Sequence, residues 1–429
     1  MNNDEPLILG DRSVPRLIAF YLTQFHPTPE NDLWWGKGFT EWTNVTKAKP
    51  LFEGHRQPYL PSDFGFYDLR VRETRRDQIK MAKQYGVDGF CYYWYWFSGK
   101  RLLNFPLDDM LADSESDMPF CLCWANENWT RRWDGADSEI LIEQKYLPDD
   151  DLNFIKSLVP FFEDRRYIRL DGKPYLIVYR PQHLPNARKT VEIWRDYCRS
   201  IDLGEIHVCA ALNQGNEDYV NFGFDSGVEF PPLNRRTKNI NSQLNFYDHF
   251  RGSVMQYAAI AQSYLDRKYS STRVFKTVFP SWDNTARTKE RALVVLNGVP
   301  DNYEYWLAST IDLVKQSGNR DALIFINAWN EWAEGCHLEP NQWFGHGFLQ
   351  ATLNAKNGLR RFATFPETGL PSKDEAFHRT FLNDLGSIIK YHAGLRLGNL
   401  KTAVNRYLWL RMAVLMVIRV TRAFRERAQ

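Results

Sequence analysis

Short apolar runs alternate along the chain with longer segments in which apolar residues recur every three or four positions. The first pattern predicts buried β-strands and the second predicts amphipathic helices. Eight runs fit the strand pattern, at residues 17–25, 87–96, 120–124, 175–179, 207–212, 227–230, 275–279 and 323–326. Six segments fit the helix pattern, at about 71–85, 149–163, 187–201, 253–268, 300–317 and 346–361. This alternation is typical of βα units around a parallel sheet.

The number of strands selects the fold. Eight strands fit a (β/α)8 barrel, so the predicted fold class is α/β with a TIM-type barrel. A doubly wound open sheet is the competing architecture, but it normally has a glycine-rich turn after its first strand. Here that turn reads His26-Pro-Thr-Pro-Glu-Asn31. We expect residues 1–14 to be an N-terminal tail, residues 15–365 to form the barrel, and residues 366–429 to be a helical extension.

The segment after the last predicted strand is the strongest candidate site. It reads Asn327-Ala-Trp-Asn-Glu-Trp-Ala-Glu-Gly335, with Glu331 and Glu334 three positions apart among tryptophans. In a (β/α)8 barrel the active site lies on the loops that follow the strands. Carboxylates can transfer protons, and indole rings can stack on the C–H face of a sugar, so a glycoside suits this segment. We predict that Glu331 and Glu334 are catalytic.

Other polar and aromatic residues follow several predicted strands at the same end. The candidates for substrate binding are His26, Trp35, Glu41, Trp42, Tyr93, Trp94, Trp96, Trp124, Asn126, Glu127, Asn128, Glu229, Trp282, Asp283, Arg287, Trp329, Asn330 and Trp332. Each also fits an ordinary role, because the aromatic residues fit a barrel core and Arg287 fits a surface ion pair. Their recurrence at one end of several strands favours a shared site.

Charge and composition narrow the possible partners. The chain has 54 basic and 52 acidic residues, and no basic block precedes residue 360, so nothing in the main body indicates nucleic-acid binding. Aromatic residues make up 15% of the chain, more than a core of this size requires, so part of them should line a site. The six cysteines lack metal-ligand spacing, and we expect buried thiols, no metal and no cofactor.

The predictions about where the protein lies in the cell come from the two ends of the chain. The N-terminal residues lack the basic and apolar regions of a signal peptide, so we expect a cytoplasmic protein. Residues 399–427 form a helical pattern rich in large apolar residues and arginine, and their longest uncharged run is too short to span a bilayer. Two interpretations stay open: an amphipathic helix at the inner-membrane surface, or a helix docked on the barrel or on a partner. The sequence does not determine the oligomeric state.

Five motifs together carry a likeness to a known family. They are Tyr21-Leu-Thr-Gln-Phe-His-Pro27, Trp34-Trp-Gly-x-Gly-Phe-Thr-Glu-Trp42, Asp88-Gly-Phe-x-Tyr-Tyr-Trp94, Trp124-Ala-Asn-Glu-Asn-Trp129 and Asn330-Glu-Trp-x-Glu-Gly335. The last motif resembles the catalytic segment of glycoside hydrolase family 99, the endo-α-mannosidases. The whole set resembles the bacterial WbsX-type branch, whose members often accompany polysaccharide or O-antigen (lipopolysaccharide) biosynthesis. The likeness covers roughly residues 15–360.

The resemblance implies a catalytic barrel that acts on glycosidic bonds with retention of configuration. In family 99, the acid that matches Glu331 takes the proton of the sugar 2-hydroxyl, whose oxygen then attacks C1 and forms an anhydro intermediate. The acid that matches Glu334 protonates the leaving oxygen and later activates water. On the same resemblance, we expect Trp94 and Trp96 to stack on the sugar, and Glu127 and Asn128 to bind its hydroxyl groups.

The main prediction is an endo-acting glycoside hydrolase for a bacterial polysaccharide or lipid-linked glycan, and three alternatives stay open. Glu127 and Glu331 could form a two-carboxylate pair, for which a separation of about 5 Å indicates a retaining enzyme and about 6.5–9.5 Å an inverting one. A glycosyltransferase in surface-polysaccharide biosynthesis is the second candidate. The sequence shows no glycine-rich diphosphate site or Asp-x-Asp metal pair, but a lipid-linked donor needs neither. The third alternative is a barrel that binds carbohydrate without turnover.

Overall fold

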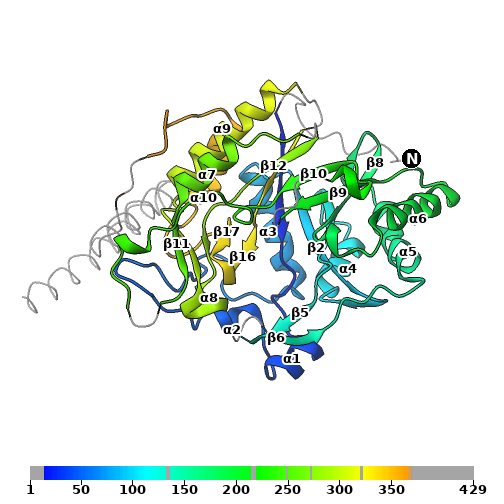
Figure 1. Cartoon of the computed structure of the whole chain (residues 1–429), viewed down its shortest axis with the longest axis horizontal. Helices are drawn as coiled ribbons and strands as arrows, with labels where there is room; N and C mark the ends of the chain where they lie inside the picture. Colours follow the sequence, from blue (N-terminus) through cyan, green and yellow to red (C-terminus); the bar gives the residue numbers. More distant parts are fainter. Residues whose placement is uncertain are drawn as a thin grey trace, which may run out of the picture. The chain divides into compact units, whose positions relative to one another are not determined.

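The computed structural model describes residues 14–131, 136–213, 219–247, 250–270, 273–318, 322–366 and 369. Eight parallel strands form a closed barrel, because β1 pairs with both β15 and β2 (Figure 1). The strands are β1 (Arg16–Tyr21), β2 (Gly89–Phe97), β4 (Phe120–Trp124), β8 (Lys173–Val178), β9 (His207–Leu212), β10 (Ser226–Glu229), β12 (Val274–Val278) and β15 (Leu323–Ile326). The predicted (β/α)8 barrel is confirmed, and each of its strands coincides with a predicted one.

Helices follow the strands on the outside of the barrel. They are α3 (Arg72–Gln84), α4 (Phe105–Ala112), α5 (Asp150–Phe162), α6 (Ala187–Ser200), α7 (Tyr257–Leu265), α9 (Pro300–Gln316) and α10 (Gly347–Lys356). The described residues between β9 and β10 contain a 3-10 turn, η3 (Val220–Phe222). The helix predicted at 253–268 is shorter, because its first residues form strand β11 (Ser253–Gln256), which pairs with β14 (Leu293–Leu296). The helix predicted at 346–361 ends at Lys356.

The loops at the ends of the barrel contain shorter helices and strands. Two small helices, α1 (Pro29–Trp35) and α2 (Glu41–Val45), follow β1. The strands β3 (Lys100–Leu102) and β7 (Arg169–Leu170) extend β2 and β8 as antiparallel neighbours. A hairpin of β5 (Trp129–Arg131) and β6 (Ala136–Ile142) follows β4. Several residues of these loop elements line the cavity of the candidate active site.

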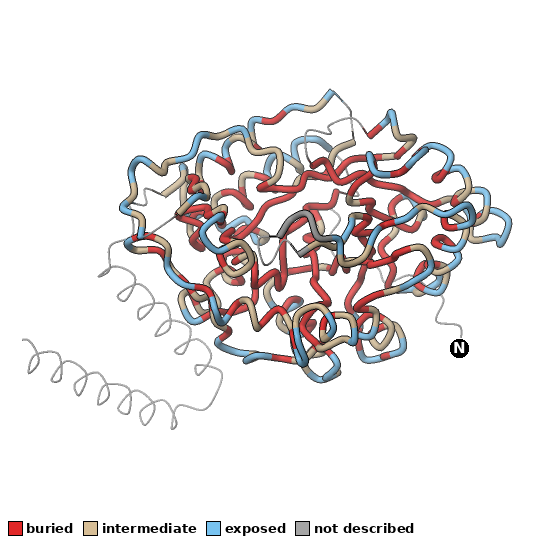
Figure 2. The backbone as a smooth tube through the Cα atoms, turned by 60° about the horizontal axis from the view of Figure 1, so that its bottom comes forward, coloured by how far each residue is buried: buried red, intermediate tan, exposed pale blue. Residues whose placement is uncertain are grey.

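Aromatic rings fill the inside of the barrel. Phe20, Tyr175, Phe275 and Phe325 come from four strands and are all buried. Their ring centroids lie 5.5 Å apart for Phe20 and Phe325 and 5.7 Å apart for Tyr175 and Phe275. Figure 2 shows the buried segments running through the centre of the molecule. Part of the aromatic surplus is therefore core, and the six cysteines are buried free thiols, as predicted.

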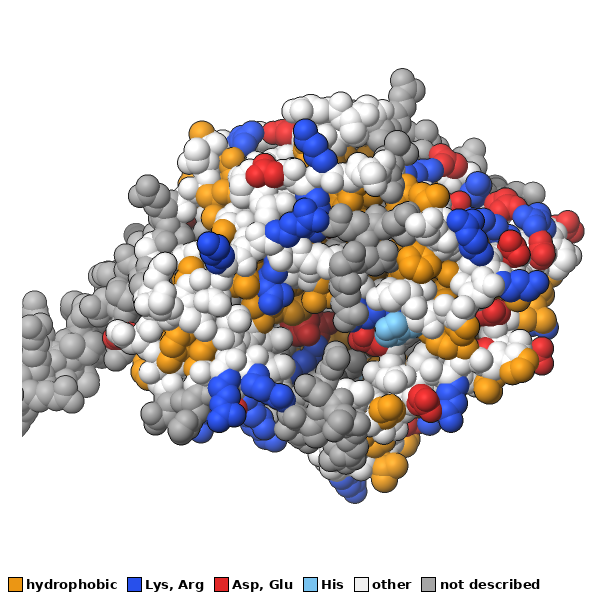
Figure 3. All heavy atoms as spheres, in the orientation of Figure 1, with side chains coloured by type: hydrophobic (Ala, Val, Ile, Leu, Met, Phe, Trp, Pro, Cys, Tyr) orange, Lys and Arg blue, Asp and Glu red, His pale blue; other side chains and the backbone are white. Residues whose placement is uncertain are grey.

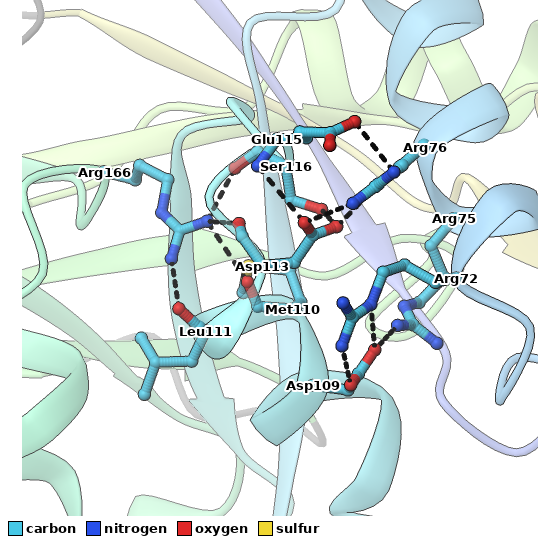
Figure 4. A network of polar contacts seen from close by, with 10 residues as sticks. All are labelled: Arg72, Arg75, Arg76, Asp109, Met110, Leu111, Asp113, Glu115, Ser116 and Arg166. Carbon is cyan, nitrogen blue, oxygen red and sulfur yellow. Dashed lines mark hydrogen bonds and ion pairs between the residues drawn. The ribbon is translucent and has the colours of Figure 1, made fainter.

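A charged network joins α3, α4 and the loop before β7 (Figure 4). Arg76 pairs with Asp113 at 2.7 Å, and Ser116 donates a hydrogen bond to the same carboxylate at 2.9 Å. Arg166 donates to the backbone carbonyls of Asp113 and Ser116. The hydrogen bonds from Arg76 hold the pKa of Asp113 well below its usual value. The network stabilises the packing of these outer helices.

A small lobe stands beside the barrel and has its own apolar core. Strands β11, β14 and β13 (Trp282–Asp283) form its sheet, and helix α8 (Thr285–Thr288) follows β13. The core consists of the buried residues Phe52, Val254, Ala292, Val294 and Leu296. We call residues 47–56, 233–247, 250–256 and 282–296 the side lobe. It lies around the β11 and α8 labels in Figure 1.

The predictions about both chain ends fall almost wholly outside the described residues. Residues 1–13 and the predicted helix at 399–427 are not described, so the N-terminal tail, the C-terminal extension and both interpretations of its helix stay predictions. Among the helices of the described ranges, none has the length and apolar character that crossing a bilayer requires.

Candidate active site

A cavity of about 410 Å³ lies among the loops that follow the barrel strands. Figure 3 looks onto this face and shows acidic side chains within a hollow, with basic side chains beside it. Eight of the predicted site residues line the cavity: Trp35, Tyr93, Glu127, Asn128, Trp282, Arg287, Glu331 and Glu334. These side chains lie on, or in the loops after, the first, second, third, seventh and eighth predicted strands, as expected for a barrel site.

Glu331 and Glu334 lie on a short hairpin that hydrogen bonds attach to the end of β1. Strand β16 (Asn330–Glu331) pairs with β17 (Cys336–His337), and the 3-10 turn η6 (Trp332–Glu334) joins them. Asn330 ties the hairpin to the end of β1, because its Oδ1 accepts from the Leu22 N–H at 2.8 Å and its Nδ2 donates to the Leu22 carbonyl at 3.0 Å. Gly335 ends the turn with a φ of 56°. A Cβ at Gly335 would lie 2.9 Å from the Asp283 carbonyl oxygen, so glycine is required.

Arg287 on α8 binds three carboxylates at once. Its guanidinium lies 2.6 Å from Glu331, 2.8 Å from Glu334 and 3.2 Å from Glu41, which belongs to α2. The Glu41 side chain has no exposed surface and that of Glu331 is 6% exposed, whereas that of Glu334 is 23% exposed. One positive charge therefore serves three acids that have little contact with water.

Burial, together with the shortage of positive charge, raises the pKa values of the three acids. Burial raises the pKa of Glu331 to about 8, against the opposing effect of Arg287, and the negative charges of Glu334 and Glu41 add to the increase. Burial also raises the pKa values of Glu334 and Glu41. Burial disfavours the charge on Arg287, but the acids outweigh this and raise its pKa. The cluster therefore retains at least one proton at neutral pH, as proton transfer requires.

Glu127 lies in another part of the cavity wall and has a different partner. Its Oε2 accepts from the Nε of Arg180 at 2.9 Å. Asn126 positions Arg180, because the Arg180 N–H donates to Asn126 Oδ1 at 2.7 Å and Asn126 Nδ2 donates to the Arg180 carbonyl at 2.8 Å. Arg180 was not among the predicted site residues. Its position directly after the fourth predicted strand is the signal that could have identified it.

Comparisons with known proteins assign the chain to a family. The sequence profile described as "Glycosyltransferase WbsX" matches residues 17–352. The chain belongs to the WbsX family. It is 41% identical over 375 residues to "Uncharacterized protein WxcX" of Xanthomonas campestris pv. campestris, in each of two strains. The match covers 87% of this chain and 54% of that protein, so the chain spans about half the length of these relatives.

Solved structures share the barrel of this WbsX-family chain. The endo-alpha-mannosidase of glycoside hydrolase family 99 from Bacteroides thetaiotaomicron superposes with a TM-score of 0.52 at 15% identity, covering 81% of this chain and 98% of that one. A "Glycoside hydrolase-like protein" superposes with a TM-score of 0.51 at 13% identity, covering 82% of this chain and 97% of that one. At such identities the likeness shows the fold alone.

The aromatic wall of the WbsX-family cavity differs from the predicted one. Tyr93 and Tyr95 line the cavity, whereas Trp94 and Trp96 do not. Trp94 lies under the guanidinium of Arg101 at 4.0 Å, and Trp96 packs away from the cavity and donates to a carboxylate on α5 at 2.9 Å. Alternate residues of a strand face opposite sides, so the tyrosines face inward and the tryptophans face the helices. The geometry gives no support to sugar stacking by Trp94 and Trp96.

Ten further predicted residues are buried without lining the cavity: His26, Glu41, Trp42, Trp124, Asn126, Glu229, Asp283, Trp329, Asn330 and Trp332. Glu41, Asn126 and Asn330 instead support residues of the cavity wall, as described above. Of the other seven, Trp42, Trp124, Glu229, Asp283 and Trp332 make hydrogen bonds within the protein. For example, Asp283 accepts from His55 at 2.6 Å and from Gln57 at 2.7 Å. Direct contact of these ten residues with a substrate stays a prediction, which the cavity lining does not support. Within the described ranges, no group of three His, Cys, Asp or Glu side chains is arranged to hold a metal ion.

Proposed function

We propose that this WbsX-family protein cleaves a glycosidic bond in a bacterial polysaccharide or a lipid-linked glycan, with Glu331 and Glu334 as the catalytic pair. The observation that carries the proposal is that both glutamates line one cavity and share one guanidinium. Cleavage needs a proton for the leaving oxygen and a base for the attacking group. Two acids that retain a proton between them at neutral pH supply both.

The proposed roles follow the likeness to family 99. Glu331 acts as the base toward the sugar 2-hydroxyl, Glu334 protonates the leaving oxygen and then activates water, and the configuration is retained in an endo-acting reaction. The greater exposure of Glu334 supports this division, because the acid must reach the leaving group and later an incoming water. Glu331 must release its proton before it acts as a base, since its pKa is about 8 in the free protein.

The first test is the release of reducing ends from a panel of bacterial surface polysaccharides. Glu334→Gln should reduce the rate about 10²–10⁴-fold with the fold intact, because it removes the proton donor. The exposed Glu192 on α6 provides a matched control, and Glu192→Gln should cleave like the wild type. Normal turnover by Glu334→Gln would sink the assignment.

A second test separates the roles of the two acids. An aryl glycoside with a good leaving group needs little protonation of its leaving oxygen. Once the sugar is identified, Glu334→Gln should therefore still release the aryl group in the first step, whereas Glu331→Gln should not. The opposite pattern would exchange the two roles.

Sugar transfer is the second candidate function, because the family is described as a glycosyltransferase. The same acid pair can deliver a sugar to an acceptor hydroxyl instead of to water. Incubation with a lipid-linked glycan and an oligosaccharide acceptor should then give a longer product by mass spectrometry, without free reducing sugar. Tight binding of a nucleotide sugar in calorimetry would favour a transferase with a soluble donor.

A further inference from the structure

The side lobe carries a local excess of positive charge, although the whole chain has a net charge of only +2. Besides Arg287, its basic residues are Lys47, Lys49, Arg56, Arg235, Arg236, Lys238, Arg251, Lys289 and Arg291, against three acids, Glu53, Asp283 and Glu290. Asp283 is buried and bound by His55 and Gln57, so it adds little negative charge to the surface.

Backbone contacts show that the basic segments of the side lobe are neighbours. The Arg251 N–H donates to the Glu290 carbonyl at 2.7 Å, which places Arg251 beside Lys289 and Arg291. The Nε of Arg235 contacts the sulfur of Met255 on β11. In Figure 3, basic side chains gather over the region of β11 and α8, next to the hollow that holds the acids.

An exposed aromatic ring lies in the same lobe. Tyr247 is 49% exposed, which is unusual for so large a side chain in a chain that buries most of its aromatic residues. The Tyr247 N–H donates to the Leu51 carbonyl at 2.8 Å, two positions from Lys49. An exposed aromatic face suits the C–H face of a sugar ring, and nearby Lys and Arg side chains suit its anionic substituents.

The side lobe also forms one wall of the cavity, through Trp282, Asn284, Thr288 and Leu293. Thr288 directly precedes Lys289, so the basic surface begins at this wall of the cavity. We propose that the side lobe binds an acidic polysaccharide, whose carboxylate or phosphate groups pair with its Lys and Arg side chains while one sugar ring stacks on Tyr247. This proposal rests on the proposed function and adds the charge class of its substrate.

The test is binding, in calorimetry, of carboxymethyl dextran and of unmodified dextran with the same chain length. The full chain should bind the charged polymer more tightly, and added salt should weaken that binding, because exposed charge pairs are screened. The triple variant Lys49→Glu, Arg251→Glu, Lys289→Glu should lower the affinity about tenfold or more, as the loss of three exposed pairs predicts.

A control variant shows whether the affinity depends on the total charge of the protein or on the position of the charged residues. The control triple variant Lys80→Glu, Lys189→Glu, Lys315→Glu makes the same change of charge on outer helices and should bind like the wild type. Dextran phosphate in place of carboxymethyl dextran shows which anion is preferred. Tyr247→Ala should weaken the binding of both charged dextrans but leave that of inorganic polyphosphate unchanged.

Three outcomes overturn the proposal: equal binding of neutral and charged dextran, unchanged binding by the side-lobe variant, or tighter binding of single-stranded RNA or of phosphatidylglycerol vesicles than of either charged dextran. None of these measurements depends on turnover. A polysaccharide that binds the side lobe but is cleaved normally by Glu334→Gln would refute the catalytic assignment alone. Cleavage that requires Glu334, without charge-dependent binding, would refute the side-lobe surface alone.

Discussion

Replacing Glu331 by Gln should stabilise the protein at neutral pH while removing the proposed glycosidase activity. The Gln side chain has nearly the same volume and can accept the hydrogen bond that Arg287 now donates to Glu331 at 2.6 Å. It differs in never carrying a negative charge. Because burial is what raises the pKa of Glu331, the wild type must either keep a proton there or bury an unfavourable charge.

The magnitude follows from the pKa of Glu331, which rises from 4.5 to about 8 on folding. Between these values the folded state binds more protons than the unfolded state, so the free energy of unfolding falls as the pH rises, by about 1.4 kcal/mol per pH unit. By pH 7 the wild type should have lost about 3 kcal/mol relative to Glu331→Gln, as an upper value because the neighbouring acids share the proton.

The assay is urea unfolding of both proteins between pH 5 and pH 8. The two free energies of unfolding should be similar near pH 5 and diverge toward pH 8, with Glu331→Gln the more stable. Asp113→Asn provides a control of opposite sign. The pKa of Asp113 is lowered, so its charge stabilises the fold above the unfolded pKa, and the variant should be less stable at neutral pH. A Glu331→Gln variant that is less stable than the wild type at pH 7 would refute the reasoning.

Three further predictions concern the cavity and the side lobe. Arg287→Met removes the cation that opposes burial, so the pKa values of the bound acids should rise and the alkaline limb of the pH–rate profile should move to higher pH; an unchanged limb would contradict this. Glu127→Gln should lower the rate less than Glu334→Gln and keep the configuration of the product, as followed by NMR; an equal loss would favour a two-carboxylate mechanism with Glu127. Asp283→Asn weakens a buried acceptor of His55, and we expect faster hydrogen exchange at residues 251–256 and 292–296 with unchanged exchange in α5.

The barrel could be predicted from the sequence because its signal is local. Each strand is a short apolar run, and long stretches of chain separate the runs, so their number and order can be read along the chain. The direction of each side chain could not be read in this way. Parallel barrel strands are buried on both faces, and residues 92–97 are aromatic at every position, so no alternation distinguishes Tyr93 and Tyr95 from Trp94 and Trp96.

The rest of the site depends on contacts between distant parts of the chain. Glu331 and Glu334 were predicted from their motif, but their shared partner Arg287 lies 44 positions from Glu331, and Glu41 lies 246 positions from Arg287. The sequence predicts a helix where strand β11 begins for the same reason, because only the pairing of β11 with β14 makes it a strand. Such pairings carry no pattern in a single sequence.

The contact between Gly335 and Asp283 has a mechanical consequence. A Cβ at Gly335 would lie 2.9 Å from the Asp283 carbonyl oxygen, and Ser281 donates to the Gly335 carbonyl at 2.6 Å. The hairpin that carries the two glutamates therefore packs directly against the start of the side lobe at Asp283. If the side lobe binds a glycan as proposed, the sugar units held there would lie at a set distance from the two glutamates, and that distance would set the length of the fragments that cleavage releases.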